Sequence, residues 1–149
     1  MKKFSFRLQT VLDLRERVKE QKEQELAQLS YQVQLLVERQ QQWEAEKDQK
    51  LEEQRSLSQG TLDLEAVGWY EAYLYALDER LYQGSQQLEQ VREAREKKRQ
   101  ELMEATKACE ILLKLKERDH REFLLALDRA ENQLIDELAT VRFNRERNT

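Results

Sequence analysis

Apolar residues recur every three or four positions along almost the whole chain, and polar or charged residues fill the positions between them. Steps of three and four place these residues on one face of an α-helix, whereas a β-strand would require a step of two. A repeat of seven residues is typical of helices that pack in a left-handed coiled coil. The pattern therefore predicts long helices that meet along a narrow seam.

The first apolar stripe predicts a helix over about residues 4–57. Its positions are Val11, Leu14, Val18, Lys22, Leu26, Leu29, Val33, Leu36, Gln40, Trp43 and Lys47. Two consecutive steps of four around Lys22 indicate a stutter, which locally unwinds a supercoil. Lys22, Gln40 and Lys47 bring polar groups into the seam, where such groups help to fix the register at a cost in stability.

The second stripe is more regular and predicts a helix over about residues 69–143. Its positions are Val67, Tyr70, Leu74, Leu77, Leu81, Gly84, Leu88, Val91, Arg95, Lys98, Leu102, Ala105, Cys109, Leu112 and Lys116, followed after stutters by Phe123, Leu127, Ala130, Leu134, Leu138 and Val141. Because this helix is the longer one, we expect its last one to two dozen residues to extend past the start of the first helix.

The chain has no proline, and two of its three glycines lie within about residues 58–68, so the bend is predicted there. Gly60 can adopt the left-handed conformation that ends a helix. Thr61 or Asp63 can cap the next helix by accepting a backbone N–H bond. The predicted fold is all-α, a long antiparallel two-helix coiled coil, or helical hairpin, that forms a single domain over residues 1–149.

The composition narrows the possible functions. Charged residues make up 38% of the chain, which is typical of a coiled coil, and the periodic apolar residues argue against disorder. A net charge of −4 disfavours binding to nucleic acid, which needs a basic face. No apolar run approaches the roughly 20 residues that span a bilayer, so we expect no membrane insertion. Cys109 is the only cysteine, which fits a reducing compartment and a small seam residue.

The sequence contains no motif that would support catalysis. His120 is the only histidine, and with one distant cysteine it cannot supply a zinc site. We interpret it as a solvated residue on a helix. The sequence also lacks a glycine-rich phosphate loop and the Ser-His-Asp order of a catalytic triad. We therefore predict that the protein is not an enzyme and needs no metal or cofactor.

An aromatic group just after the bend is the first candidate partner-binding surface. Trp69, Tyr73 and Leu77 recur at four-residue spacing and line one helical face, while Tyr70 lies on the neighbouring face. A thin seam is not expected to bury both faces, and tryptophan and tyrosine are favoured interface anchors. Trp43 on the first helix is a further candidate. Local packing around the turn is one alternative. Another is that the docking surface lies on the first helix near Leu36, Gln40 and Trp43.

The end of the second helix is the second candidate surface. Leu134, Leu138 and Val141 continue the apolar stripe where no residue of the first helix is left to cover it, and Ile135 lies next to them. Asp136 and Glu137 lie between them. Exposed apolar groups of this kind mark candidate sites for a partner.

Several stretches in order resemble one protein family. Residues 4–15, Phe-Ser-Phe-Arg-Leu-Gln-Thr-Val-Leu-Asp-Leu-Arg, are similar to the opening of the flagellar export protein FliJ. Residues 70–77 resemble the Tyr-x-x-Phe-Leu-x-x-Leu pattern of that family, with Tyr73 in place of phenylalanine. Residues 113–118 and 134–139 are similar to its Leu-x-x-Leu-Lys-Glu-Arg and Leu-Asp-Glu-Leu-Ala patterns, with small shifts in spacing.

The resemblance implies both a fold and a set of partners. The family fold is an antiparallel two-helix coiled coil similar to the shaft subunit of rotary ATPases. The implied role is a cytoplasmic stalk and chaperone component of flagellar type III protein export, peripheral at the cytoplasmic face of the cell membrane, in a pathway that serves flagellum biogenesis, motility and chemotaxis. The implied partners are the hexameric export ATPase FliI, the export gate protein FlhA and export chaperones.

We therefore interpret the chain as a stalk that is monomeric in isolation. The end that carries residues 134–141 would bind the ATPase ring, and the bend end with Trp69, Tyr70, Tyr73, Leu77 and Trp43 would bind the gate. The equivalent stalk of a virulence-type secretion system is the nearest alternative. A structural coiled coil that dimerises through one continuous helix is an alternative of another class, and the bend signals at Gly60 favour the hairpin.

Overall fold

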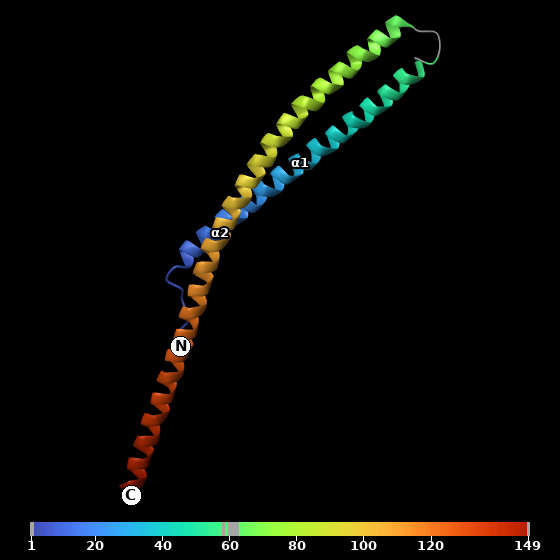
Figure 1. Cartoon of the computed structure of the whole chain (residues 1–149). Helices are drawn as coiled ribbons and strands as arrows, with labels where there is room; N and C mark the ends of the chain where they lie inside the picture. Colours follow the sequence, from blue (N-terminus) through green and yellow to red (C-terminus); the bar gives the residue numbers. More distant parts are fainter. Residues whose placement is uncertain (1, 58, 60–62, 149) are drawn as a thin grey trace. The chain divides into compact units, whose positions relative to one another are not determined.

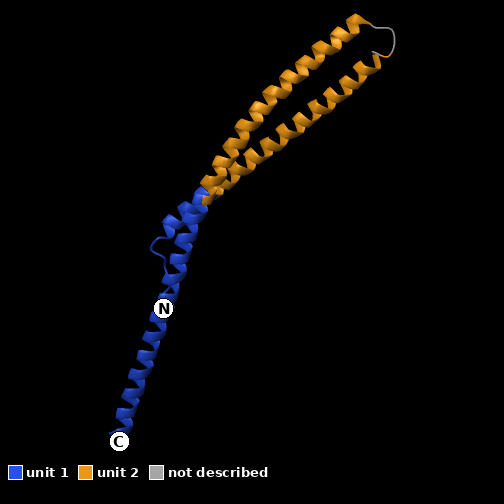
Figure 2. Ribbon diagram, in the orientation of Figure 1, with its two compact units in different colours: residues 1–19, 104–149 blue, residues 20–103 orange. Residues whose placement is uncertain are grey.

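The computed structural model describes residues 2–57, 59 and 63–148, which form helix α1 (Gln9–Leu57) and helix α2 (Leu64–Arg147) (Figure 1). No strand occurs in these ranges. The chain divides into two compact units, and each is described by itself. Unit 1 comprises residues 1–19 and 104–149, and unit 2 comprises residues 20–103 (Figure 2). The single-domain organisation remains a prediction.

In unit 2 the two helices lie side by side and run antiparallel (Figure 2). Glu25 Oε2 lies 2.7 Å from Lys98 Nζ. Glu53 is 28 residues further along α1, and its Oε2 accepts a 3.0 Å hydrogen bond from Tyr70, which is 28 residues before Lys98 on α2. The register is therefore the same at the two ends of the unit. This pairing within one chain confirms the all-α helical hairpin and argues against one continuous helix.

The second apolar stripe was predicted correctly. Every one of its positions from Val67 to Lys116 is buried or half-buried, whereas most residues between them are exposed. Leu77 is the deepest large side chain of unit 2, and Cys109 is buried in unit 1, as expected for a small seam residue. The polar positions Arg95 and Lys98 are half-buried as well, because a long stem can cover the seam while its charged end stays in water.

The start of the first stripe was predicted wrongly. Val11 and Leu14 are exposed, and Leu12 is buried in their place at 1% exposure. Leu12 lies seven residues before Lys19, and Lys19 is half-buried next to Val18, which keeps its predicted place in the stripe. The apolar pattern was misleading because a half-buried lysine occupies the seam position at residue 19, while two neighbouring apolar residues face solvent.

Helix α1 begins at Gln9, five residues later than predicted. The segment before it is not helical, and its two phenylalanines pack in unit 1. Phe6 is buried, and the Phe4 ring lies 4.9 Å from the ring of His120 and 5.7 Å from that of Phe123. His120 is exposed, as expected, but one side of its ring packs against Phe4. Aromatic packing of this segment therefore takes the place of a first helical turn.

The bend is shorter than the predicted range of 58–68, because α1 ends at Leu57 and α2 begins at Leu64. Gly68 lies inside α2 and not in the bend. A Cβ atom added at Gly68 would meet nothing within 4 Å, so no close packing requires a glycine there. Gly60 and Thr61, the predicted helix end and one of the two predicted caps, lie outside the described residues.

Asp63 is the residue that caps helix α2. Its Oδ1 accepts hydrogen bonds from the backbone N–H groups of Glu65 at 3.1 Å and Ala66 at 3.4 Å. These groups would otherwise lack partners, because the first N–H groups of a helix have no carbonyl before them. The carboxylate also compensates the positive end of the helix dipole. The second of the two predicted caps is therefore confirmed.

Four charged residues form a half-buried cluster in the seam of unit 2. Lys22 lies 3.1 Å from Glu101, and Lys98 lies 2.7 Å from Glu25 and 3.1 Å from Glu101. The hydrogen bond from Lys98 is the main cause that lowers the pKa of Glu25, and the hydrogen bond from Lys22 is the main cause that lowers the pKa of Glu101. The cluster places opposite charges at matching heights on the two helices and so favours this register over a shifted one.

We expect the cluster to make the stability of the protein depend on pH. A carboxyl group whose pKa falls on folding contributes stability above its unfolded pKa, and this contribution is lost as the pH falls through the folded pKa. The melting temperature, followed by circular dichroism, should therefore drop more between pH 7 and pH 3 for the wild type than for a variant with Glu25→Gln and Glu101→Gln. At pH 7 the variant should melt a few degrees lower. Parallel pH profiles would show that the cluster contributes nothing to stability.

Candidate partner-binding surfaces

Three aromatic residues near the start of α2 form the aromatic cluster: Trp69, Tyr70 and Tyr73. The Trp69 ring lies 4.9 Å from the Tyr70 ring in an edge-to-face arrangement and 5.3 Å from the Tyr73 ring in a stacked one. Both are favoured geometries for aromatic pairs. Trp69 and Tyr73 are four residues apart and Tyr70 and Tyr73 are three apart, so these rings lie on neighbouring parts of one side of the helix.

Helix α1 holds the two tyrosines through their hydroxyl groups. Tyr70 donates to Glu53 at 3.0 Å, and Tyr73 donates to Glu46. Lys50 lies on α1 between these two acids, and its Nζ atom is 5.5 Å from the centre of the Tyr73 ring. Each tyrosine therefore spans from α2 to α1, with its ring over the seam and its hydroxyl group at the edge of the partner helix.

These contacts shift the pKa values of Tyr70, Glu53 and Lys50. The hydrogen bond to Glu53 raises the pKa of Tyr70, and the same bond lowers the pKa of Glu53. The hydrogen bond to Glu53 raises the pKa of Lys50. All three groups are held further in the form that they already have at neutral pH. The hydrogen bonds therefore join the cluster to α1 without changing the charge of these three groups at neutral pH.

The side chains of the aromatic cluster are much less exposed to solvent than the sequence indicated. Leu77 was predicted to share an open face with Trp69 and Tyr73, and this is wrong, because Leu77 is only 1% exposed. Tyr70 and Tyr73 are both half-buried, so neither of the two stripes is left outside the seam. The reason is the length of tyrosine, which lets its ring cover the seam from a flanking position. Trp69 alone stays widely open, at 54% exposure.

Trp43 packs on the seam of unit 2 near Gly84. A Cβ atom added at Gly84 would lie 3.2 Å from the Trp43 ring and would overlap the amide of Gln40. The Gln40 amide donates a 3.0 Å hydrogen bond to the backbone oxygen of Leu81, so α1 and α2 approach closely here. The guanidinium carbon of Arg39 lies 4.9 Å from the centre of the Trp43 ring. Trp43 is half-buried, so its ring packs mainly in the seam between the two helices.

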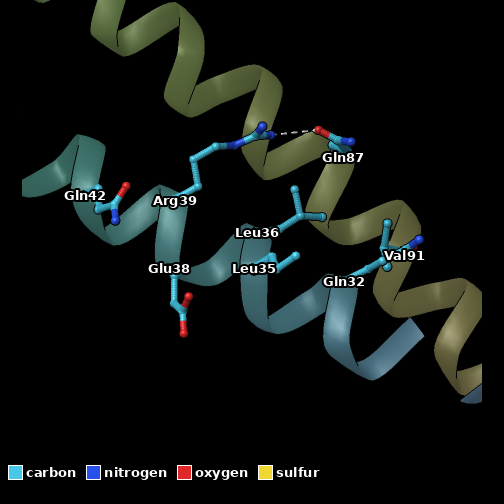
Figure 3. Close-up of a pocket in the computed structure, with 8 residues that line it drawn as sticks. All are labelled: Gln32, Leu35, Leu36, Glu38, Arg39, Gln42, Gln87 and Val91. Atoms are coloured by element: carbon cyan, nitrogen blue, oxygen red, sulfur yellow. Dashed lines mark hydrogen bonds between the residues drawn. The ribbon is translucent and has the colours of Figure 1, made fainter. Parts of the chain in front are cut away.

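A shallow groove of about 570 Å³ lies beside these residues in unit 2 (Figure 3). Its apolar part comes from Leu35 and Leu36 on α1 and Val91 on α2. Arg39 reaches across to Gln87 and donates a 3.1 Å hydrogen bond that closes one end (Figure 3). The other lining residues are Gln32, Glu38 and Gln42. The groove includes Leu36, the residue around which the sequence placed the alternative docking surface.

The C-terminal overhang, residues 124–148 of unit 1, is exposed along its whole length. The N-terminal segment packs on α2 as far as Phe123, and every residue from Leu124 to Asn148 is exposed. The predicted residues Leu134, Ile135, Leu138 and Val141 are each more than half exposed. Asp136 and Glu137 are exposed beside them. The uncovered stripe that the sequence predicted is therefore present.

Sequence reasoning missed the residues that hold and flank the aromatic cluster. Glu46, Lys50 and Glu53 contact the tyrosines from α1, and only the register between the helices reveals this. Tyr75 and Tyr82 are 70% and 65% exposed on α2. Their seven-residue spacing off the seam stripe was a usable signal, because it places both rings on one outward side of the helix.

The described residues also bear on two other kinds of site. No helix in the described part of the chain is both long and apolar enough to cross a membrane. Within the same residues, no group of three or more histidine, cysteine, aspartate or glutamate side chains is placed to hold a metal ion.

Comparison with known proteins identifies the family. The chain matches the family described as Flagellar FliJ protein over residues 4–148, which is nearly its whole length. Neither the curated proteins nor the solved structures gave a match. The family match confirms the resemblance of the four sequence stretches. The chain therefore belongs to the flagellar FliJ family, whose members are non-catalytic components of the flagellar export apparatus.

Proposed function

We propose that this chain is the stalk that links the hexameric export ATPase FliI to the export gate protein FlhA in flagellar protein export. The observation that carries the proposal is the C-terminal overhang, an apolar stripe without cover on a chain of this family. The protein would act in the cytoplasm, at the cytoplasmic face of the cell membrane. Its contribution would be mechanical and positional, since the family is non-catalytic.

The ATPase contact would use Leu134, Leu138 and Val141. These residues lie three or four positions apart, so they share one side of α2, and each is more than half exposed. An uncovered apolar stripe on a helix is favourable to bury against a partner at about 25 cal/mol per Å² of apolar surface. Glu137 would lie at the edge of the contact, where charges contribute to orientation more than to affinity, whereas Asp136 lies on the opposite side of α2.

The gate contact would use Trp69, with Tyr70 and Tyr73 behind it. The indole is the open part of the aromatic cluster, and the two tyrosines are tied to α1 by hydrogen bonds. An anchor that is already fixed loses little freedom on binding. Trp43 is now proposed only as a neighbour that supports the seam, because it is half-buried. Leu77 is withdrawn from this surface because it is buried.

Export chaperones are the third class of partner that the family implies, and the groove beside Leu35, Leu36 and Val91 is the surface that we assign to them. It offers apolar side chains from both helices with polar groups at its ends. A stalk in a virulence-type system has the same general form, but the family match favours the flagellar system.

The ATPase contact is tested with two changes in the overhang. We expect Leu134→Asp with Leu138→Asp to abolish stimulation of purified FliI, because two carboxylates would have to lose water at the contact. The matched control is Leu125→Asp, which replaces an equally exposed leucine on the opposite side of α2. Both variants should keep the helical circular dichroism of the wild type, since all three positions are exposed. Undiminished stimulation by the double variant would refute the proposed contact.

A further inference from the structure

The charges of the C-terminal overhang are separated along its length. Its first half carries Asp128, Glu131, Asp136 and Glu137 against a single cation, Arg129. Its second half carries Arg142, Arg145 and Arg147 against a single acid, Glu146. Basic residues at the end of a helix compensate its dipole. The dipole does not account for the acidic half, which lies two to five turns further from the end.

The apolar residues of the same segment follow a coiled-coil spacing. Leu124, Leu127, Leu134, Leu138 and Val141 fall on alternating steps of three and four, with Glu131 at the remaining position. In unit 2 the same spacing is covered by α1, whereas in the overhang every one of these residues is exposed. The segment therefore has the sequence of one half of a helical pair and, within unit 1, no second helix beside it (Figure 2).

We propose that the overhang pairs antiparallel with the overhang of a second copy of this chain. One register satisfies both patterns. When Leu134 of one copy lies opposite Leu138 of the other, Glu131 lies opposite Val141 and next to Arg142, and Asp128 lies opposite Asn144 and next to Arg145. The two-fold axis passes near residue 136, and each of these pairs occurs twice. The interface is self-complementary, as a two-fold contact must be.

The charges favour the antiparallel arrangement over the parallel one, because in the antiparallel pair only Asp136 and Glu137, next to the two-fold axis, meet the same acids of the other copy. In a parallel pair each acid would face the same acid of the other copy, and each arginine the same arginine, which is destabilising. The pairing covers only about 25 residues in each copy and belongs to the small, transient class of interfaces, below about 1,200 Å². The protein is thus expected to be a monomer when dilute, as the sequence predicts, and a dimer when concentrated. This pairing does not depend on the proposed ATPase contact, because it is measured on the purified chain alone.

Charge reversal in the full chain tests the pairing. One variant carries Asp128→Arg and Glu131→Arg, and the other carries Arg142→Glu and Arg145→Glu. Sedimentation equilibrium should show a concentration-dependent dimer for the wild type and at least a tenfold weaker dimer for each variant alone. An equal mixture of the two variants should dimerise again, because the arginines introduced at 128 and 131 then lie next to the glutamates introduced at 142 and 145. Helical circular dichroism checks that each variant keeps its fold.

Crosslinking tests the direction of the pairing. In a Cys109→Ala background, Ile135→Cys lies next to the two-fold axis, and a short bis-maleimide should link two copies. The matched control is Leu124→Cys, whose two copies would be about 36 Å apart in the antiparallel register. A wild type that is monomeric at all concentrations would overturn the proposal, as would efficient crosslinking of Leu124→Cys. A mixture of the two charge variants that stays monomeric would overturn it equally.

Discussion

Replacement of Leu77 by aspartate is expected to unfold most of unit 2. Leu77 is only 1% exposed, in a fold that has few such deeply buried side chains. Removing a buried leucine side chain costs about 2–5 kcal/mol, and a carboxylate at the same place must also lose water without a partner. Since small folds are stable by only about 5–15 kcal/mol, we expect loss of much of the helical circular dichroism at 37 °C.

The matched control for this change lies two residues earlier on the same helix. Tyr75 is 70% exposed, so Tyr75→Asp should change the unfolding free energy by no more than about 0.5 kcal/mol. The pair of variants separates burial from helix propensity, because aspartate enters the same helix in both. A Leu77→Asp variant that melts like the wild type would mean that the seam does not run through this residue.

The second helix could be read from the sequence because its own residues determine its seam. From Val67 to Lys116 the apolar spacing is regular, and even the polar positions Arg95 and Lys98 follow it. A long helix without proline has one way to bury such a stripe, which is against a partner helix. The hairpin fold follows from two stripes of this kind and a glycine between them. The cap at Asp63 was also predictable, since aspartate is a favoured residue at that position.

The start of the chain was harder to predict because its packing is not periodic. Phe4 and Phe6 pack from a segment that is not helical, and no spacing rule describes such a segment. Leu12 could not be told from Val11 and Leu14 by type, since all three are apolar. The correct choice depends on continuing the seam through a lysine, which a search for apolar residues passes over.

The exposure of the two candidate surfaces was predicted with different accuracy, because only one of them depends on contacts between the helices. The overhang required only the relative lengths of the two helices, and its exposure was foreseen. The aromatic cluster required the contacts of Tyr70 and Tyr73 with Glu53 and Glu46, which lie on the other helix. Spacing on one helix cannot show that a flanking tyrosine leans across the seam. The sequence therefore placed these aromatic residues near one another but overestimated how many of them are open.

Replacement of Trp69 by alanine is expected to weaken binding to the gate protein by about 30-fold or more. Trp69 is 54% exposed and is held from behind by the stacked ring of Tyr73 at 5.3 Å. Truncating a tryptophan anchor in an interface commonly costs about 2 kcal/mol or more of binding free energy. Titration calorimetry with the purified cytoplasmic part of FlhA measures the affinity. Stimulation of FliI should stay at the wild-type level, because the overhang is unchanged.

Two further observations decide what a loss of gate binding means. The matched control, Tyr82→Ala, removes an aromatic ring that is 65% exposed on another side of α2, and it should bind the gate like the wild type. The melting temperature of Trp69→Ala should fall by only a few degrees, because half of the indole already faces water and Tyr70 and Tyr73 keep their bonds to α1. A large fall in melting temperature would make the cluster a packing element of the bend end. Wild-type affinity in a stable Trp69→Ala variant would instead move the docking surface to the groove, where Leu35→Asp is the next change to measure, since Leu35 is an exposed part of its apolar lining.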